Sequence, residues 1–239
     1  MPTQPDPPSG PPPGATRGWY AGLVGLFTAL LVISNVSAVK LIGLGSLGLG
    51  GLDLDLTVDG GAFLFPVTYI LGDVLAEVYG FRATRRAILL GFFCSALAVA
   101  SFWLVQAAPP AANWGGQAAY EATLGFVPRI VAASLAGYLA GQLSNALVLT
   151  AMKRRSGGRA LWRRLLGSTA VGEAADTAVF CVIAFYGVIR GAQFAGYLVL
   201  GYVYKCLVEA LLLPVTYRVV AAVKRHDSPP PPSSTMPSA

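Results

Sequence analysis

The chain has 239 residues, of which 55% are hydrophobic and only 12% are charged, with a formal net charge of +6. Water-soluble domains carry about 25% charged residues, so this composition excludes an ordinary soluble enzyme or binding domain. The mean hydropathy is +0.62, and the apolar residues fall in blocks long enough to cross a bilayer, which takes ~20 residues as a helix. The sequence therefore predicts an integral membrane protein.

Six apolar blocks follow one another along the chain, at residues 19–44, 62–79, 87–107, 127–152, 165–188 and 194–220. Each is predicted to be a transmembrane helix, because lipid offers no partner to unpaired backbone groups. Pro-rich residues 1–18 and residues 222–239 are predicted to be disordered tails that flank a transmembrane domain of residues 19–221. The expected fold class is all-α, a polytopic membrane protein with six transmembrane helices.

A weak internal similarity relates the first three blocks to the last three. The dipeptide Ser-Asn recurs at residues 34–35 and 144–145, and an acidic pair marks the second and fifth blocks. An inverted repeat of three plus three helices, as in many secondary transporters, is therefore one hypothesis for the architecture.

The distribution of basic residues predicts the orientation. Thirteen of the 17 Lys and Arg residues lie near the chain ends or in the loops that follow the second and fourth blocks. Cytoplasmic loops collect Lys and Arg, so both termini are predicted to face the cytoplasm of a bacterial plasma (inner) membrane. The positive net charge then reflects membrane topology, and nucleic acid is not expected as a partner.

Several motifs suggest a binding or catalytic site but lack the neighbouring elements or the residue spacing that such a site needs. Residues 43–48, GLGSLG, match a dinucleotide fingerprint, but no predicted strand precedes them. Together with the following GLDLDLTVDGG they are interpreted as a Gly-rich outer loop, with or without a short hairpin. The three cysteines show no paired spacing and the lone His226 lies near the end of the chain, so neither a metal site nor a catalytic set is predicted. We expect no enzyme activity and no cofactor.

Polar side chains inside the predicted helices are the candidate functional residues. A charge at mid-membrane costs roughly 2.5–3.5 kcal/mol even on lenient scales, so such side chains normally face a cavity or one another. Acidic or basic residues three or four positions apart share one helix face. The candidate substrate-binding residues are Asn35, Lys40, Asp73, Glu77, Arg129, Gln142, Asn145, Glu173, Asp176 and Lys205.

Two interpretations of this polar set stay open. The bases could simply neutralise acids and hold the helices together. For Lys205 and Glu209, which lie one turn apart, this structural explanation is as good as a functional explanation. Counting Glu209, however, five acids face three bases inside the predicted helices. The two unmatched negative charges favour a site for a cationic, protonated or donor-rich solute, with Asp73 and Asp176 as its main members.

Five segments resemble, in order and spacing, the vitamin-uptake-transporter family, whose named members are queuosine-precursor transporters. They are SNVSAVK, FPVTYILGDVLAEVYG, AASLAGYLAGQLSN with Arg129 before it, GSTAVGEAADTAVFCVIAFYG and YKCLVEALLLP, and they extend from about Ser34 to Pro214. Family members vary at the positions of Glu77, Asn145 and Glu173. The resemblance therefore applies best to Asp73, Arg129, Gln142, Asp176 and Lys205.

The resemblance implies import of 7-cyano-7-deazaguanine or 7-aminomethyl-7-deazaguanine for the salvage of tRNA queuosine. The guanine-like edge of these molecules offers a ring N–H and an exocyclic amino group, two parallel donors that one carboxylate can accept together. We expect Asp73 to face a central cavity and Glu77, one turn nearer the cytoplasm, to support or gate it. The flat ring suits a slot formed by aromatic side chains chosen from Phe65, Tyr69, Phe180 and Tyr204.

Three other functions remain open at the level of sequence. One is a proton-coupled or ion-coupled carrier for another vitamin-like solute. A second is a membrane-embedded substrate-binding subunit energised by an external ATPase, as in energy-coupling-factor systems, since the chain has no Walker motif of its own. A third is a structural membrane protein.

The predicted orientation can be checked by cysteine-accessibility labelling. Single cysteines introduced in the basic segment 153–164 should react only after a membrane-permeant reagent reaches the cytoplasm, because this segment holds six of the Lys and Arg residues. Labelling of these positions by an impermeant reagent in intact cells would contradict the orientation.

Overall fold

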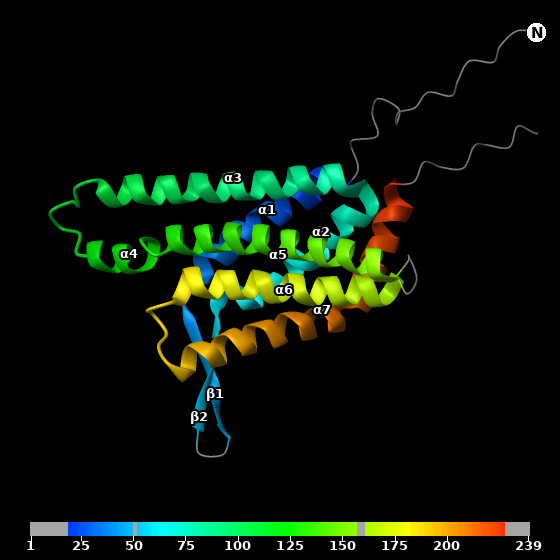
Figure 1. Ribbon diagram of the computed structural model, residues 1–239. Coiled ribbons are helices and arrows are strands. Elements are labelled where there is room, and N and C mark those ends of the chain that lie inside the picture. The colour runs from blue at the N-terminus through cyan, green and yellow to red at the C-terminus, as the bar shows by residue number, and fades with distance from the viewer. Residues whose placement is uncertain (1–18, 50–51, 157–160, 228–239) are drawn as a thin grey trace, which may run out of the picture.

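The computed structural model describes residues 19–49, 52–156 and 161–227, which form a bundle of helices with a projecting β-hairpin (Figure 1). The main helices are α1 (Tyr20–Ser37), α2 (Phe65–Val74), α3 (Gly80–Ala107), α4 (Gln117–Leu124), α5 (Val127–Ser156), α6 (Leu161–Phe185) and α7 (Ala192–Asp227). The hairpin consists of β1 (Leu41–Leu49) and β2 (Leu52–Asp59). A 3-10 turn, η2 (Gly60–Phe63), joins it to α2, and a π-helical turn, η3 (Leu75–Tyr79), follows α2.

Five helical runs among the described residues are long and apolar enough to cross a membrane: Tyr20–Ser37, Phe65–Ala107, Gln117–Met152, Gly167–Phe185 and Ala192–His226. Six separate helices were expected. The second and third predicted helices form one run because helical structure continues from α2 through η3 into α3 without a non-helical residue between them. Within this run the chain reverses direction between η3 and α3 (Figure 1), at Gly80, whose φ of 79° suits a residue without a Cβ.

The structure is mostly helical as predicted, forms the hairpin that the sequence left open, and corrects two of the predicted boundaries. The first helix ends at Ser37 and does not reach residue 44, because the chain turns into β1. Leu41 pairs with Asp59 in an antiparallel register that is irregular between Gly43 and Ser46. The alternation of Leu with Asp or Thr in LDLDLTVD is the two-residue period of a strand. At the other end α7 continues to Asp227, so residues 222–227 are helical; residues 1–18 and 228–239 lie outside the described residues.

The two ends of the described chain lie at the same end of the bundle (Figure 1). The Trp19 ring contacts the His226 ring edge-on, with centroids 5.6 Å apart. The Tyr20 hydroxyl donates to the Ala83 carbonyl at 3.2 Å, which brings the start of α3 to the same place. We call this the terminal end of the bundle, and the opposite one, where the hairpin emerges, the hairpin end.

Two clusters of buried apolar residues fill the bundle and leave a polar layer between them. The cluster at the terminal end joins α1, α2 and the end of α7, with Leu71 and Val223 among its members. The cluster at the hairpin end joins α5, α6 and the start of α7, with Ile130 and Phe185 among its members. Large apolar side chains such as Phe93, Trp103 and Leu143 are exposed on the outside of the bundle, as expected for surfaces that face lipid.

Helices α5 and α6 are in close contact because glycines face each other. A Cβ added at Gly141 would lie 2.9 Å from the Cβ of Asp176 and 3.0 Å from the carbonyl oxygen of Gly172. Small residues at such contacts let two helix backbones approach, which is the common way of packing helices in membranes. The contact holds Asp176 against α5.

Substitution of Gly141 by Ala should therefore lower the thermal stability of the detergent-solubilised protein. The added methyl group forces α5 and α6 apart, and such overpacking costs about 1–3 kcal/mol. The matched control is Gly25→Ala, because a Cβ at Gly25 meets no atom within 4 Å and Ala favours a helix. Equal melting temperatures for the two variants would contradict the described α5–α6 contact.

Candidate functional site

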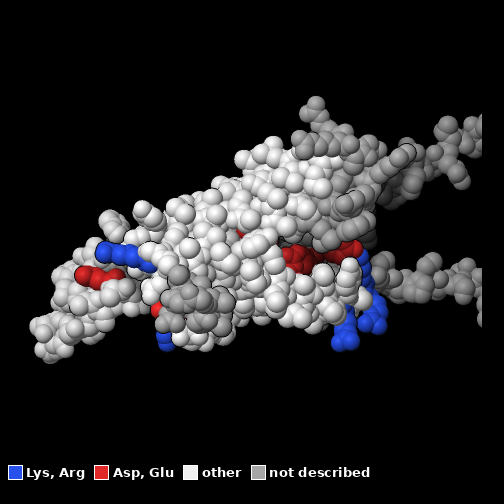
Figure 2. Space-filling model, turned by 60° about the horizontal axis from the view of Figure 1, so that its bottom comes forward, with Lys and Arg blue, Asp and Glu red and all other residues white. Residues whose placement is uncertain are grey.

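A cavity of about 410 Å³ lies in the polar layer, between the two apolar clusters. Its walls come from α1, α2, α3, α5, α6 and α7, with contributions from the end of β2 and from η2. Small-molecule sites usually enclose roughly 300–1,000 Å³, so the volume suits a ligand of modest size. Figure 2 shows acidic side chains recessed between uncharged residues on one face of the molecule.

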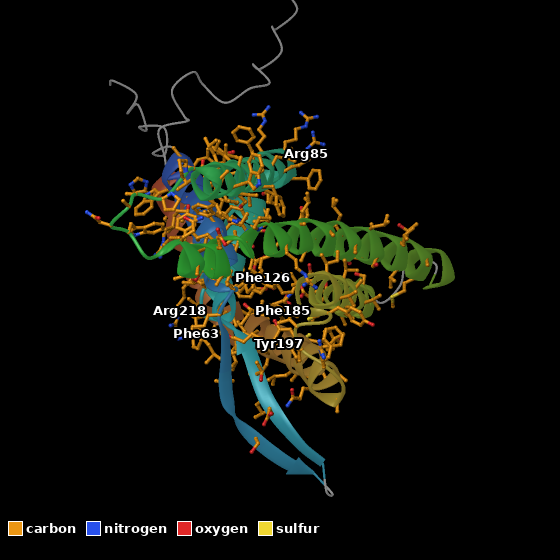
Figure 3. All side chains as sticks on the ribbon, turned by 90° about the vertical axis from the view of Figure 1, so that its left-hand side faces the viewer. Phe63, Arg85, Phe126, Phe185, Tyr197 and Arg218 are labelled. Atoms are coloured by element: carbon orange, nitrogen blue, oxygen red, sulfur yellow. The ribbon has the colours of Figure 1, made fainter. Side chains whose placement is uncertain are left out.

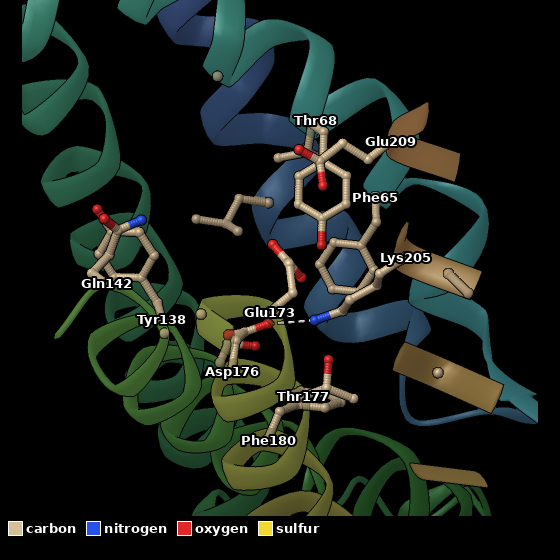
Figure 4. A pocket seen from close by; sticks show the side chains of 18 of the residues that line it. Phe65, Thr68, Tyr138, Gln142, Glu173, Asp176, Thr177, Phe180, Lys205 and Glu209 are labelled. Atoms are coloured by element: carbon tan, nitrogen blue, oxygen red, sulfur yellow. Dashed lines mark hydrogen bonds and ion pairs between the residues drawn. The ribbon is translucent and has the colours of Figure 1, made fainter. Parts of the chain in front are cut away.

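The charged centre of the cavity lies between α6 and α7. The Lys205 ammonium donates to Asp176 Oδ2 in an ion pair, and the two side chains are only 14% and 24% exposed. Glu173, one turn before Asp176, lies on the side of Lys205 nearer to Glu209 (Figure 4) and interacts with the ammonium electrostatically. Lys205 thus pairs with α6, across the bundle, and not with Glu209 on its own helix.

Three polar atoms in the walls of the cavity have no hydrogen-bond partner among the described residues. They are Asn145 Oδ1, Glu173 Oε2 and Thr177 Oγ1. Buried polar atoms are nearly always paired, and leaving one without a partner costs about 1–3 kcal/mol. Their position in the cavity wall indicates that a polar ligand, or water in its place, completes these bonds.

The remaining acids of the cavity are Asp73 on α2 and Glu209 on α7. The two carboxylates interact electrostatically with each other, and no ion pair joins either of them to a base among the described residues. Gln142 and Asn145 line the cavity from α5. The four aromatic residues proposed for the slot also line it, from α2, α6 and α7: Phe65, Tyr69, Phe180 and Tyr204.

The hairpin end of the cavity is closed by hydrogen bonds between the base of the hairpin and α7. Asp59 accepts from the Tyr197 hydroxyl at 2.7 Å and from the Gly61 amide at 2.9 Å. Burial raises the pKa of the Asp59 carboxyl above its usual range, although both hydrogen bonds act in the opposite direction. The Tyr204 hydroxyl donates to the Ala62 carbonyl at 2.8 Å.

Aromatic rings extend this closed end toward α5. Phe185 packs edge-on against Tyr197, with ring centroids 5.1 Å apart, and tilted against Phe126 at 6.2 Å (Figure 3). Phe185 is 1% and Tyr197 3% exposed, so this part of the bundle is fully packed.

Four of the sequence-predicted residues lie outside the cavity walls. Arg129 caps the end of α6, donating to the carbonyls of Ile183 and Tyr186 at 2.6 Å each. This contact satisfies carbonyls that a helix end leaves unpaired. Lys40 is exposed in the turn between α1 and β1.

Asn35 and Glu77 form contacts elsewhere in the bundle. Asn35 is buried between helices, accepting from the Ser134 hydroxyl at 2.8 Å and donating to Ser95 at 3.4 Å. Glu77 lies in the π-helical turn at the terminal end and accepts from Lys224 at 2.6 Å, and both side chains are largely exposed. The cavity therefore brings together six of the ten predicted residues: Asp73, Gln142, Asn145, Glu173, Asp176 and Lys205.

Three of the cavity residues that were not among the sequence-predicted site residues are charged or carry an unpaired polar atom. Thr177 carried no signal, because a lone Thr in an apolar helix is common. Glu209 was assigned to the polar set but excluded from the site because Lys205 could neutralise it. Asp59 was placed in the outer loop, although an Asp before two glycines is a typical cap for a helical turn, which it provides here.

The charges of the cavity predict that Lys205 and Asp176 differ in their effect on stability. Lys205→Met leaves Asp176 and Glu173 together without a cation and should cost about 3 kcal/mol, as for a broken buried ion pair. Asp176→Asn should lower the free energy of unfolding by less, because Glu173 still interacts electrostatically with the ammonium. Thermal unfolding of both variants in detergent tests this order, and a reversed order would show that Glu173 does not compensate.

Comparison with known proteins identifies the family. The model of the vitamin uptake transporter family matches residues 59–219. A Bacillus subtilis (strain 168) protein named "Probable queuosine precursor transporter" is 31% identical over 202 residues, which cover 82% of this chain and 83% of that protein. The Escherichia coli (strain K12) "Queuosine precursor transporter" is 29% identical over 126 residues, 53% of this chain and 54% of that protein.

A Haemophilus influenzae protein, also named "Probable queuosine precursor transporter", is 27% identical over 166 residues, 68% of each chain. No solved structure matches this chain. The family match covers the chain from the base of the hairpin to the last turns of α7, and thus nearly every wall of the cavity. This membrane protein belongs to the vitamin uptake transporter family, a family of transporters and not of enzymes.

Proposed function

We propose that this protein carries queuosine precursors, the 7-deazaguanines, across the bacterial plasma membrane into the cell. The names of its relatives in three bacteria support this substrate class. The observation in the structure that carries the proposal is the buried Oε2 of Glu173, which has no partner among the described residues and lies beside the Lys205–Asp176 pair.

The recognition step follows from the hydrogen-bond donors and acceptors of the ligand. A guanine-like edge presents a ring N–H and an amino N–H side by side, and the Glu173 carboxylate accepts both. Lys205 uses one N–H on Asp176 and has two left, of which one donates to the ligand O6. The rings of Phe65 and Tyr69, whose centroids lie 6.1 Å apart at an interplanar angle of 20°, form part of the apolar wall for the flat base.

The transport path in this proposal has six membrane crossings, with α2 and η3 forming a short second crossing. Phe65–Tyr79 has 15 residues, about 22 Å of helix at 1.5 Å per residue, less than the ~30 Å of a bilayer core. Short or interrupted helices next to a cavity are a common feature of secondary transporters. With the terminal end facing the cytoplasm, the closed hairpin end faces outward, and the cavity is reached from the cytoplasmic side near the exposed Asp73.

Competition with the uptake of labelled 7-cyano-7-deazaguanine tests the proposed function. Cells that lack their own importer and express this protein should take up the compound. An analogue without the 2-amino group should compete poorly, because it leaves a carboxylate oxygen of Glu173 without its donor. Sites built on a hydrogen-bonded group reject the analogue that lacks it by up to ~10⁴-fold.

The variant Glu173→Gln should reduce uptake strongly, since an amide presents one acceptor where the carboxylate presents two. Glu121→Gln is the matched control: Glu121 is an exposed acid of α4 that accepts from Gln117, away from the cavity. Absence of 7-deazaguanine uptake by well-accumulated protein would overturn the proposed substrate. Uptake with equal competition by adenine-like and 2-amino-free analogues would leave the substrate in place and assign the carboxylates to ion coupling.

A further inference from the structure

Thr177 lines the cavity from α6, yet recognition of the guanine-like edge leaves its hydroxyl unused. The residue is only 2% exposed, and its Oγ1 has no hydrogen-bond partner among the described residues. A helical Thr often donates to the carbonyl four residues earlier, as Thr68 does to Leu64 at 3.3 Å. The Thr177 hydroxyl does not form this bond and points into the cavity (Figure 4). Because buried hydroxyls nearly always have a partner, a ligand atom, or water in its place, completes the bond.

The position of this hydroxyl follows from the two helices that hold the charged centre. Thr177 and Glu173 share one face of α6 and lie one turn, about 6 Å, apart along the helix. Figure 4 shows Glu173 on the side of the Lys205 ammonium nearer to Glu209, and Thr177 on the other side. Three polar groups therefore follow one another toward the hairpin end: the carboxylate of Glu173, the ammonium of Lys205 and the hydroxyl of Thr177.

The contact of Thr177 with α7 agrees with this order. A Cβ added at Gly201 would lie 3.7 Å from the Thr177 Cγ2, so Thr177 is level with Gly201 on α7. Helix α7 runs from the apolar cluster at the hairpin end to the cluster at the terminal end. Lys205 follows Gly201 by one turn and is therefore nearer to the terminal end than Thr177. The methyl group of Thr177 faces α7 at this contact, which leaves its hydroxyl to the cavity.

A 7-deazaguanine carries its polar groups in a matching order. Along one side of the fused ring, the ring N–H is followed by O6 and then by the substituent on C7. In the proposed function the ring N–H donates to Glu173 and O6 accepts from Lys205. The C7 substituent then extends toward the hairpin end, where the Thr177 hydroxyl lines the cavity.

We propose that the hydroxyl of Thr177 binds the C7 substituent and makes Thr177 a specificity-determining residue for the two precursors. The inference rests on the proposed function and extends it to the other end of the ligand. A hydroxyl can donate to the nitrogen of a 7-cyano group and accept from an N–H of a 7-aminomethyl group. One side chain therefore recognises both precursors. An apolar substituent of the same size leaves the buried hydroxyl without a partner, which weakens binding.

Competition on the unmodified protein is the first test of the inference. Uptake of labelled 7-cyano-7-deazaguanine is measured in the presence of the unlabelled compound or of 7-ethynyl-7-deazaguanine. The ethynyl group is linear and nearly the same size as the cyano group, but it has no nitrogen lone pair. We expect the cyano compound to compete at least about fivefold better, the factor for one hydrogen bond. Equal competition by the two compounds would overturn the inference, while the measured uptake would still support the proposed function.

The same comparison on variants assigns the preference to the hydroxyl. Thr177→Val keeps the size of the side chain and removes the hydroxyl, so the two competitors should become equivalent while uptake of the cyano compound persists. Thr177→Ser keeps a hydroxyl and should keep the preference. The matched control is Thr28→Val, which should also keep it, because the buried Thr28 hydroxyl has no partner among the described residues and lies outside the cavity walls. Full preference in Thr177→Val would show that another group binds the substituent and would overturn the inference.

If Thr177→Val fails to accumulate in the membrane, the competition on the unmodified protein decides the inference. If that protein takes up no 7-deazaguanine at all, the proposed function fails, and the inference fails with it. The two failures are distinguishable, because uptake of the cyano compound is measured before the ethynyl compound is added.

Discussion

One ammonium group inside an apolar bundle determines how the last two helices meet. Lys205 of α7 is largely buried, and a buried charge is tolerated only with a partner. Its partner is Asp176 of α6, so the ion pair fixes both the rotation of α7 and its register along α6. The three other residues that depend on this placement are Glu173, Thr177 and Glu209, which share the same two helices and face the same cavity.

The glycines of α5 and α6 make this arrangement possible. Gly137 and Gly141 contact Asp176 so closely that a side chain at either position would meet its atoms at 2.9 Å. The carboxylate is therefore held against a backbone, a rigid surface, and its position does not depend on flexible neighbours. Rigid support of this kind keeps a charged side chain in place without a second base.

The two ends of the cavity differ in how they are closed. At the hairpin end, Asp59, Tyr197 and Tyr204 form hydrogen bonds between the hairpin, η2 and α7, over a tightly packed aromatic layer. At the terminal end η3 and α7 are joined by the exposed Glu77–Lys224 pair and by the buried apolar cluster that contains Leu75 and Val223. Exposed ion pairs contribute little, about 0–1 kcal/mol, so the apolar cluster provides most of the stability of this contact.

The sequence alone determined the membrane class, the apolar helical segments and the identity of most of the polar side chains in the cavity. It could do so because each of these follows from local properties: hydropathy over about twenty residues, and the rule that charged side chains on an apolar helix turn away from lipid. The resemblance to a transporter family also followed from sequence, since it depends on the order of short segments such as FPVTYILGDVLAEVYG.

Tertiary structure decided which side chains meet. Lys205 had Glu209 one turn away and Asp176 29 residues away, and only the packing of α6 on α7 selects the distant partner. The sequence could not show that Arg129 lies outside the cavity, because a basic residue at the start of one helix can cap the end of a distant helix or face a ligand equally well. The role of Asp59 was hidden for the same reason, because it accepts from Tyr197 of α7, 138 residues later in the chain.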